Sequence, residues 1–358
     1  MIDGHEDLAW NALTFGRDYL QPAWSTRQRE AGGPVPSQNG QATLGLAEWI
    51  LGRIAVVFAT LFASPLRRKA GAWDTLCYAT PAQAQEIYRR ELEHYQHWVG
   101  DSHDRLQLIA TREDLEAILT AWKEEDLTRR KVGLVLLMEG AEGILQPSEV
   151  EAWYEGGVRI LGPAWAGNRY CGGTREPGPL TPQGHQLLRA MAPFNLILDL
   201  SHMAEQSFRT ALDVYPGPVA ASHSNARALS RGYAWPDRHL SAEMIQALAE
   251  RGGVMGLVPY NAFLKGGWTL ADGKQAVSLD RFCDQVDYVC QVTGDAEHVA
   301  LGSDLDGGFG LEAIPRELDT AADLLTIAVL LQDRGYREAD RRNILGGNWM
   351  RLLRRALP

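Results

Sequence analysis

Short apolar segments rich in β-branched residues recur along the chain, separated by stretches long enough to be helices. We expect eight strands, over residues 1–5, 54–61, 132–139, 158–165, 196–202, 218–223, 253–259 and 299–304. Amphipathic stretches predict helices between them, over residues 81–98, 112–122, 182–191, 204–214, 241–251, 279–292 and 320–333. Continuous apolar strands that alternate with helices are typical of a parallel sheet buried on both faces. The pattern therefore predicts an α/β fold, a (β/α)8 TIM-like barrel with its active site at the carboxyl ends of the strands.

Three stretches depart from this rhythm. Residues 18–44, rich in Gly, Pro, Gln and Ser, are predicted to form a long polar loop. Residues 62–130 are predicted to be a helical insertion after strand two, and residues 338–358 a C-terminal helix that packs on the outside of the barrel. Long excursions of such barrels are usually lids or subunit contacts, which leaves a homodimer open. We expect residues 1–358 to form a single barrel domain, because α/β barrels routinely exceed the average domain length.

Composition and charge narrow the function classes. The chain is 45% hydrophobic and 22% charged, which is ordinary for a soluble globular protein. Its net charge of -10 argues against a nucleic-acid partner. No apolar segment is long enough to cross a membrane, and no basic segment followed by an apolar one marks a leader, so we expect a cytoplasmic protein. The four cysteines show no CxxC spacing and are expected to be buried thiols.

Candidate chemistry lies at the ends of the predicted strands. His5 and Asp7 are two residues apart in the first strand, so their side chains point the same way. Other strands also end in metal-ligand types, namely Glu139, His202, His223 and Asp304. Burying such groups without partners costs ~2–7 kcal/mol for a neutral polar group and more for a charge. A shared metal site would remove that cost for all of them.

Three histidines and three carboxylates are too many ligands for one tetrahedral zinc, but they suit two metals that share a bridge. Glu139 is the best candidate for the bridging ligand. A carboxylated lysine is the alternative bridge, yet Lys265 lies only near a strand end and Lys131 opens strand three at the wrong end. Asp306, two residues after Asp304, is predicted either to support that residue or to cap the Gly-rich turn.

Six motifs occur in order from the first residues to the last dozen: DGHEDL, MEG, DLSH, ASHSNAR, GSDLDGG and GGNWMRLL. Together they resemble the renal or membrane dipeptidase family of zinc peptidases over essentially the whole chain. The resemblance implies a distorted barrel of the metal-dependent hydrolase type. It also implies two Zn²⁺ or other divalent ions per chain. The implied roles are one ion on His5 and Asp7, the other on His202 and His223, a bridge at Glu139, and proton transfer at Asp304.

The chain departs from the family at two substrate-binding positions. Trp165 stands where family members commonly carry a histidine that contacts the reacting group, and an indole cannot carry a proton. The family arginine for the substrate carboxylate precedes a Pro-Asp pair, and its position here falls near Tyr233. Arg238 is the preferred substitute, with Arg231 as the alternative, because such a site needs a planar two-donor cation. Tyr260, which follows strand seven, is expected to line the substrate pocket.

The resemblance implies a metal-dependent dipeptidase that acts on a small dipeptide-like substrate, including L-Xaa-D-Xaa. A metal-activated bridging hydroxide would attack the scissile carbonyl, and Asp304 would take up the proton and return it to the leaving amine. Two alternatives remain. Trp165 favours an amidohydrolase acting on N-acyl amino acids or lactams. A catalytically lapsed metal-binding module is the other, and the presence of Asp304 argues against it.

Overall fold

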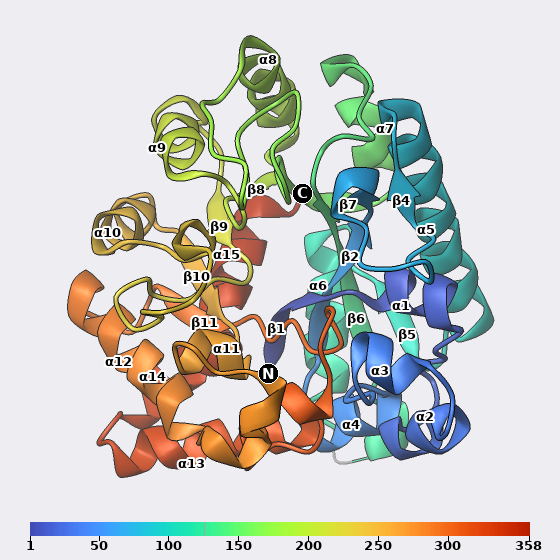
Figure 1. Ribbon diagram of the computed structural model, residues 1–358, viewed down its shortest axis with the longest axis vertical. Coiled ribbons are helices and arrows are strands. Elements are labelled where there is room, and N and C mark those ends of the chain that lie inside the picture. Colours follow the sequence, from blue (N-terminus) through green and yellow to red (C-terminus); the bar gives the residue numbers. More distant parts are fainter. Residues whose placement is uncertain (125) are drawn as a thin grey trace.

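The computed structural model describes residues 1–124 and 126–358, and its main feature is a nearly closed barrel of parallel strands (Figure 1). The strands neighbour one another in the order β1-β2-β6-β7-β8-β9-β10-β11, with every adjacent pair parallel. The ends of this order are joined where the backbone N–H of Asp304 donates to His5 O, at 3.1 Å. The predicted eight-stranded α/β barrel is confirmed.

The barrel strands match the predicted apolar segments but most end earlier. They are β1 (Ile2–Glu6), β2 (Val56–Phe62), β6 (Val132–Glu139), β7 (Val158–Gly162), β8 (Ile197–Asp199), β9 (Val219–Ala221), β10 (Val254–Leu257) and β11 (Val299–Leu301). The chain leaves the sheet before His202, His223 and Asp304, and two of these residues have left-handed backbones, with φ of 64° at His202 and 55° at Asp304. These side chains are therefore presented by tight turns rather than by the strands themselves.

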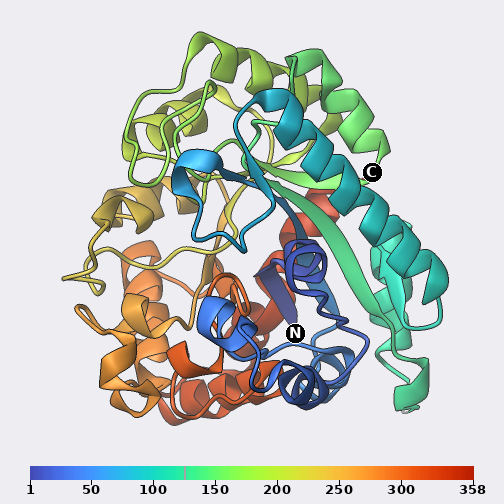
Figure 2. The same cartoon turned by 45° about the vertical axis from the view of Figure 1, so that its right-hand side comes forward.

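Helices surround the strands, as Figure 1 shows. They are α1 (Leu8–Phe15), α4 (Leu46–Leu51), α5 (Pro81–Asp101), α6 (Arg112–Ala121), α7 (Val150–Glu155), α8 (Pro182–Met191), α9 (Glu205–Val214), α10 (Ala242–Glu250), α11 (Asn261–Leu264), α12 (Asp280–Thr293), α13 (Thr326–Asp333) and α14 (Glu338–Arg342). Capping boxes start α5 at Thr80 and α6 at Thr111, because each threonine accepts from the amide three residues on while that residue bonds back. The long α5 packs along β2 and β5 on the outside of the barrel (Figure 2).

Successive side chains of each barrel strand point alternately into two separate apolar cores. In β2, Val56 and Phe58 face the barrel interior, whereas Val57 and Ala59 face the helices. Successive strand side chains point to opposite faces, so a strand buried on both faces is apolar throughout. This explains why the barrel strands appear in the sequence as continuous apolar segments.

The C-terminal segment closes the barrel at the amino-terminal ends of its strands. After α14, a π-helical turn (Asn343–Gly347) leads into α15 (Asn348–Ala356). Trp349 is fully buried against Phe58 of the inner core, with ring centroids 5.0 Å apart. Gly4 is required beside it, because a Cβ there would come within 2.8 Å of the Trp349 ring. The prediction that this segment packs on the outside of the barrel is thus wrong for α15, whose apolar face fills the barrel opening.

The stretch predicted as a polar loop contains two short helices, α2 (Ala23–Glu30) and α3 (Val35–Asn39). They lack an apolar stripe and are held by polar contacts, above all the buried ion pair from Arg17 Nε to Glu30 Oε1 at 2.9 Å. In the predicted insertion, the structure adds three short strands between the helices. They are β3 (Ser64–Pro65), β4 (Cys77–Tyr78) and β5 (Leu106–Leu108).

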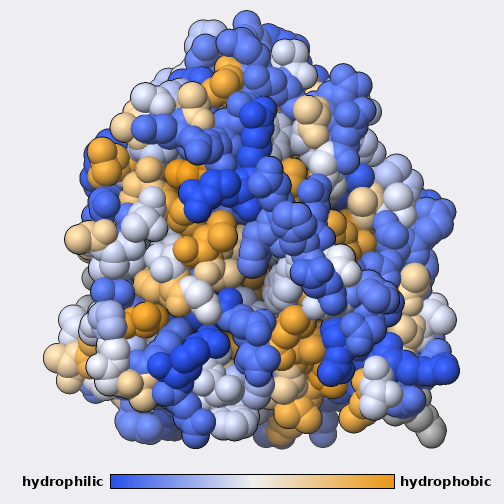
Figure 3. All heavy atoms as spheres, turned by 90° about the vertical axis from the view of Figure 1, so that its right-hand side faces the viewer, coloured by the Kyte–Doolittle hydropathy of each residue, from blue (hydrophilic) through white to orange (hydrophobic). Residues whose placement is uncertain are grey.

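On the face in Figure 3, hydrophilic side chains predominate and hydrophobic ones form separate patches. No helix in residues 1–124 and 126–358 is both long and apolar enough to cross a membrane.

Candidate active site

The carboxyl ends of the barrel strands open into a cavity of about 540 Å³. Five of the six predicted metal-centre residues line it, namely Asp7, Glu139, His202, His223 and Asp304. The sixth, His5, is fully buried directly beneath them. The structure therefore brings together all the residues that the sequence placed at strand ends.

Glu139 lies at the centre of this cluster, and its two oxygens face different partners. Oε1 is 3.2 Å from His202 Nε2 and 3.3 Å from His223 Nε2. Oε2 is 3.7 Å from His5 Nε2, which is in turn 3.6 Å from Asp7 Oδ1. Two sets of three donors thus share one carboxylate, and His5, His223 and Asp304 make a third overlapping set.

Unpartnered atoms in the cluster test whether cations fit there. His5 Nε2 and Glu139 Oε1 are both buried, and neither has a hydrogen-bond partner. The Nε2 atoms of His202 and His223 lie 2.9 Å apart and point at the same carboxylate oxygen. Leaving such atoms unpaired is costly, whereas imidazole nitrogens and carboxylate oxygens are the usual ligands of zinc. The residues present therefore fit divalent cations.

The electrostatics of the cluster favour added positive charge. Burial acts to lower the pKa of His5, but the charges of Glu139, Asp7 and Asp304 outweigh burial and raise it to about 10. Burial raises the pKa of Glu139 well above its usual range and that of Asp304 to about 7. By contrast, burial lowers the pKa values of His202 and His223, which keeps both rings neutral and able to bind a metal.

Hydrogen bonds outside the cluster orient its histidines. Ser222 Oγ donates to Asp199 Oδ2 at 2.5 Å and lies 2.8 Å from His223 Nδ1. Because the serine proton is committed to Asp199, His223 donates through Nδ1 and keeps Nε2 free for a cation. Thr174 Oγ1 lies 3.0 Å from His202 Nδ1 and holds that ring in position.

A short contact also fixes Asp7, whose Oδ1 accepts from Thr60 Oγ1 at 2.5 Å. Sequence reasoning missed these orienting residues. Asp199 and Ser222 lie inside the DLSH and ASHS motifs, which was the available signal.

Asp304 is held by the Gly-rich turn that follows β11. Its φ of 55° is left-handed, and a Cβ at Gly307 would lie 2.0 Å from Asp304 Oδ1, so only glycine fits there. Asp306 anchors the turn, since its Oδ1 accepts from the amide and the hydroxyl of Thr43 and its Oδ2 pairs with Arg17 Nη1 at 3.2 Å. Asp306 therefore supports the turn from the buried side and takes no part in the cavity.

The three predicted substrate-binding residues, Trp165, Arg238 and Tyr260, all line the cavity. Arg238 is 4% exposed, and its guanidinium donates to His223 O at 2.7 Å and to Ser224 Oγ at 3.3 Å. Its remaining N–H groups are available to a ligand. Arg231 is exposed and outside the cavity lining. Tyr233, at the position of the family arginine, also lines the cavity.

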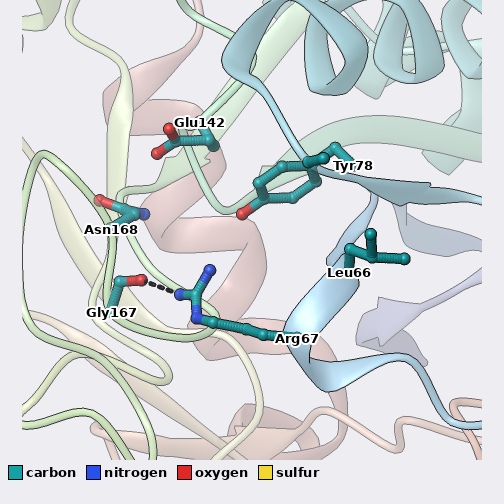
Figure 4. Close-up of a pocket in the computed structure, with 7 residues that line it drawn as sticks. Leu66, Arg67, Tyr78, Glu142, Gly167 and Asn168 are labelled. Carbon is teal, nitrogen blue, oxygen red and sulfur yellow. Dashed lines mark hydrogen bonds between the residues drawn. The ribbon is translucent and has the colours of Figure 1, made fainter.

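A second hollow of about 490 Å³ is lined by residues that include Arg67, Tyr78 and Glu142 (Figure 4). Arg67 lies at its edge and donates to Gly167 O at 2.6 Å, the contact drawn in Figure 4. Arg67 and Arg68 both pair with Glu176, at 2.6 and 2.8 Å, and Arg68 lines the first cavity. This ion-pair cluster therefore lies where the two hollows adjoin.

Comparison with known proteins agrees with this geometry. The family model of membrane dipeptidase (peptidase family M19) matches residues 1–357. An uncharacterized protein in the pqqA 5′ region of Klebsiella pneumoniae is 30% identical over 288 residues, 77% of this chain and 98% of that protein. Dipeptidase tcpJ of Claviceps purpurea is 24% identical over 331 residues, 89% of this chain and 70% of that protein.

The fold is shared with a metallo peptidase from Rhodobacter sphaeroides, solved with a phosphinate mimic of the dipeptide L-Ala-D-Ala. The TM-score is 0.77 at 22% identity, over 99% of this chain and 98% of that one. A sequence identity of 22% supports similarity of fold only. The family match over residues 1–357 shows that the chain belongs to the membrane dipeptidase family, peptidase family M19, and is a metal-dependent hydrolase of the dipeptidase type.

Proposed function

We propose that this protein is a binuclear zinc dipeptidase that hydrolyses dipeptides with a free C-terminal carboxylate, including L-Xaa-D-Xaa. The observation that carries the proposal is the shared carboxylate of Glu139, with one oxygen toward His202 and His223 and the other toward His5. Histidine and carboxylate donors in two overlapping sets suit two zinc ions. Two cations bound there would acidify a water molecule and polarise the scissile carbonyl.

Asp304 is the proposed proton carrier. It lines the cavity, and its Oδ1 lies 3.9 Å from His5 Nε2. Burial raises its pKa to about 7, which suits a carboxyl that takes a proton and then gives it up near neutral pH. Asp304 would accept the proton of the attacking water and return it to the leaving amine.

Arg238 is the proposed binding residue for the substrate carboxylate. Its side chain is rigid, because His223 O and Ser224 Oγ hold two of its donors and Phe263 packs against it at 5.4 Å. A fixed planar cation binds a carboxylate with little loss of entropy. Support for a D-residue at the C-terminal side comes from the family resemblance and from the structural relative that binds an L-Ala-D-Ala mimic.

The test is turnover by the zinc-loaded protein on a panel of L,L- and L,D-dipeptides, N-acyl amino acids and a lactam. We expect dipeptides to be cleaved. Cleavage of N-acyl amino acids or the lactam with no dipeptide turnover would overturn the proposal in favour of an amidohydrolase. No turnover at all with zinc bound would favour a lapsed site.

Arg238→Ala should raise KM for dipeptides by roughly 10–150-fold, because it removes a charge-assisted hydrogen bond. Arg231→Ala is the matched control, since Arg231 is exposed outside the cavity. Trp165→His should raise dipeptide turnover or leave it unchanged, because the tryptophan carries no proton in the reaction.

A further inference from the structure

Arg175 is a cavity residue that the proposed mechanism does not use. It lies between β7 and β8, whereas Arg238 follows β9, and both side chains line the same cavity. Arg238 is buried, but Arg175 is exposed, so it lies where the cavity opens to solvent. A cation in this place meets a ligand as it enters.

Contacts with one short segment hold Arg175 in place. Its amide N–H donates to Asp237 Oδ2 at 2.8 Å, and its Cζ lies 3.3 Å from the centre of the Trp235 ring. Its φ of 66° is left-handed, a conformation that few residues other than glycine adopt. A guanidinium stacked on an aromatic face keeps N–H groups at its edge for an anion. Arg175 is therefore oriented without the help of an anionic partner.

The acids next to Arg175 are engaged elsewhere. Glu176, the following residue, pairs with Arg67 and Arg68 at 2.6 and 2.8 Å. Asp237 accepts from the Arg175 amide, and within residues 1–124 and 126–358 it forms no ion pair with the guanidinium. The positive charge of Arg175 is thus left for a ligand.

Tyr233 lies near both arginines. Burial raises the pKa of Tyr233, and the charges of Arg238 and Arg175 both act against that rise. The Tyr233 ring is 5.6 Å from that of Trp235, on which Arg175 stacks. It is also 5.0 Å from the ring of Phe263, against which Arg238 packs at 5.4 Å. The position where the family carries an arginine is therefore flanked here by two arginines from different loops.

Outside the metal-centre residues, the cavity wall is mainly cationic. In the part of the chain that the structure describes, Arg68, Lys69, Arg175 and Arg238 line it, with Asp74 as the single carboxylate among them. The chain has a net charge of -10, so this excess of cations is local. A cleft lined by one sign of charge concentrates ligands of the opposite sign.

We infer that Arg175 binds an acidic side chain on the C-terminal residue of the substrate, while Arg238 holds the α-carboxylate of that residue. Both acid groups of such a residue extend from one α-carbon, so they reach two guanidinium groups that lie near the same tyrosine. The inference rests on the proposed function, which assigns the α-carboxylate to Arg238. The substrate class is a dipeptide that ends in glutamate or aspartate.

The first test compares an acidic substrate with its neutral isostere, using the zinc-loaded wild type. L-Ala-L-Glu should have a kcat/KM roughly 3–10-fold above that of L-Ala-L-Gln, or L-Ala-D-Glu above L-Ala-D-Gln; the gain is modest because Arg175 is exposed. The reversed dipeptides L-Glu-L-Ala and L-Gln-L-Ala are the control and should be cleaved equally, since their variable side chain is on the other residue.

Preference for glutamate in neither series, or the same preference in the reversed pair, would overturn the inference and leave the dipeptidase proposal standing. Failure to cleave any dipeptide would instead count against the proposed function.

The second test uses Arg175→Gln, with Arg189→Gln on the exposed surface of α8 as the matched control outside the cavity lining. Arg175→Gln should abolish the preference for glutamate with little change in kcat/KM for the glutamine substrate. Arg175→Lys should keep part of the preference, because the charge remains without the planar donor edge. An equal rise in KM for both substrates would overturn the inference, since Arg175 would then only position the segment that carries Arg238.

Calorimetry gives a readout that is independent of turnover. The released C-terminal amino acid is the probe: glutamate should bind the zinc-loaded wild type more tightly than glutamine, and Arg175→Gln should bind the two equally. Raising the salt concentration should reduce the difference in the wild type, because an exposed charge pair is screened. A difference that persists in Arg175→Gln would overturn the inference.

Discussion

At the scale of single residues, Glu139 is the side chain on which the metal centre depends most, because both donor sets use it. Glu139→Gln should lose both metal ions or nearly so, whereas the wild type should hold two per chain. His202→Ala should empty mainly one position, since it removes a ligand from only one set. Elemental analysis of zinc-reconstituted protein checks all three. One ion or none in the wild type would contradict the binuclear proposal.

His5 leads to a second prediction, about protons. The pKa of about 10 means that this imidazole is protonated at neutral pH in the metal-free protein. A metal binds only the neutral ring, so zinc binding should release a proton from His5. Affinity at its site should therefore fall as pH is lowered, by about tenfold per pH unit well below that pKa. Calorimetry in buffers of different ionisation enthalpy measures the released proton, and an absence of release would contradict the assignment of His5 as a ligand.

Asp304 supports a third prediction. If it carries the proton, Asp304→Asn should keep both metals and substrate affinity while lowering kcat by roughly 10²–10⁴-fold. Kinetics together with metal analysis separate this from a ligand role. Loss of metal with unchanged kcat per bound ion would show that Asp304 is a ligand.

The sequence predicted the cluster residues because His, Asp and Glu at the ends of apolar strands have no structural reason to be there. It did not predict the residues that orient them. Ser222 and Thr174 act through hydrogen bonds to rings on other segments, and those distances exist only after folding.

At the scale of elements, Asp306 joins the turn after β11 to the segment after α1. It pairs with Arg17 and accepts from Thr43, while its own carbonyl accepts from Asn11 and Asn39. Asp306→Ala should lower the free energy of unfolding by about 3–5 kcal/mol, because it leaves a buried cation partly uncompensated. Urea denaturation measures this change. Asp319→Ala, which breaks the exposed pair with Arg27, is the control and should cost under about 1 kcal/mol.

The same contacts explain which elements the sequence could predict. Seven of the eight barrel strands follow from apolar segments, because each is buried on both faces, whereas β1 is buried but carries Asp3, His5 and Glu6. The helices α2 and α3 were missed because their stability comes from Arg17, Glu30 and Asn39, which bond to distant residues rather than to an apolar stripe. Hydrophobic periodicity in a sequence marks helices that bury an apolar face. These two helices bury polar groups instead.

At the scale of the whole molecule, α15 is part of the barrel interior. Trp349→Ala should lower the free energy of unfolding by about 3–5 kcal/mol, since it leaves a large cavity against Phe58 and Gly4. Denaturation with urea measures the loss. A loss no larger than that of an exposed side chain would contradict this packing.

The position of α15 also has a consequence for how the protein is made. Trp349 lies against Gly4 in the first strand, and the turn that carries Asp304 bonds to His5. The strand β1 and the helix α15, which lie far apart in the sequence, therefore have to meet before the barrel closes. Until residues 348–356 have left the ribosome, β1 lacks its contact with Trp349. His5 and Asp7 are then not yet held in position beside the other metal-ligand residues. The nascent chain should acquire its metals only after translation of α15 is complete.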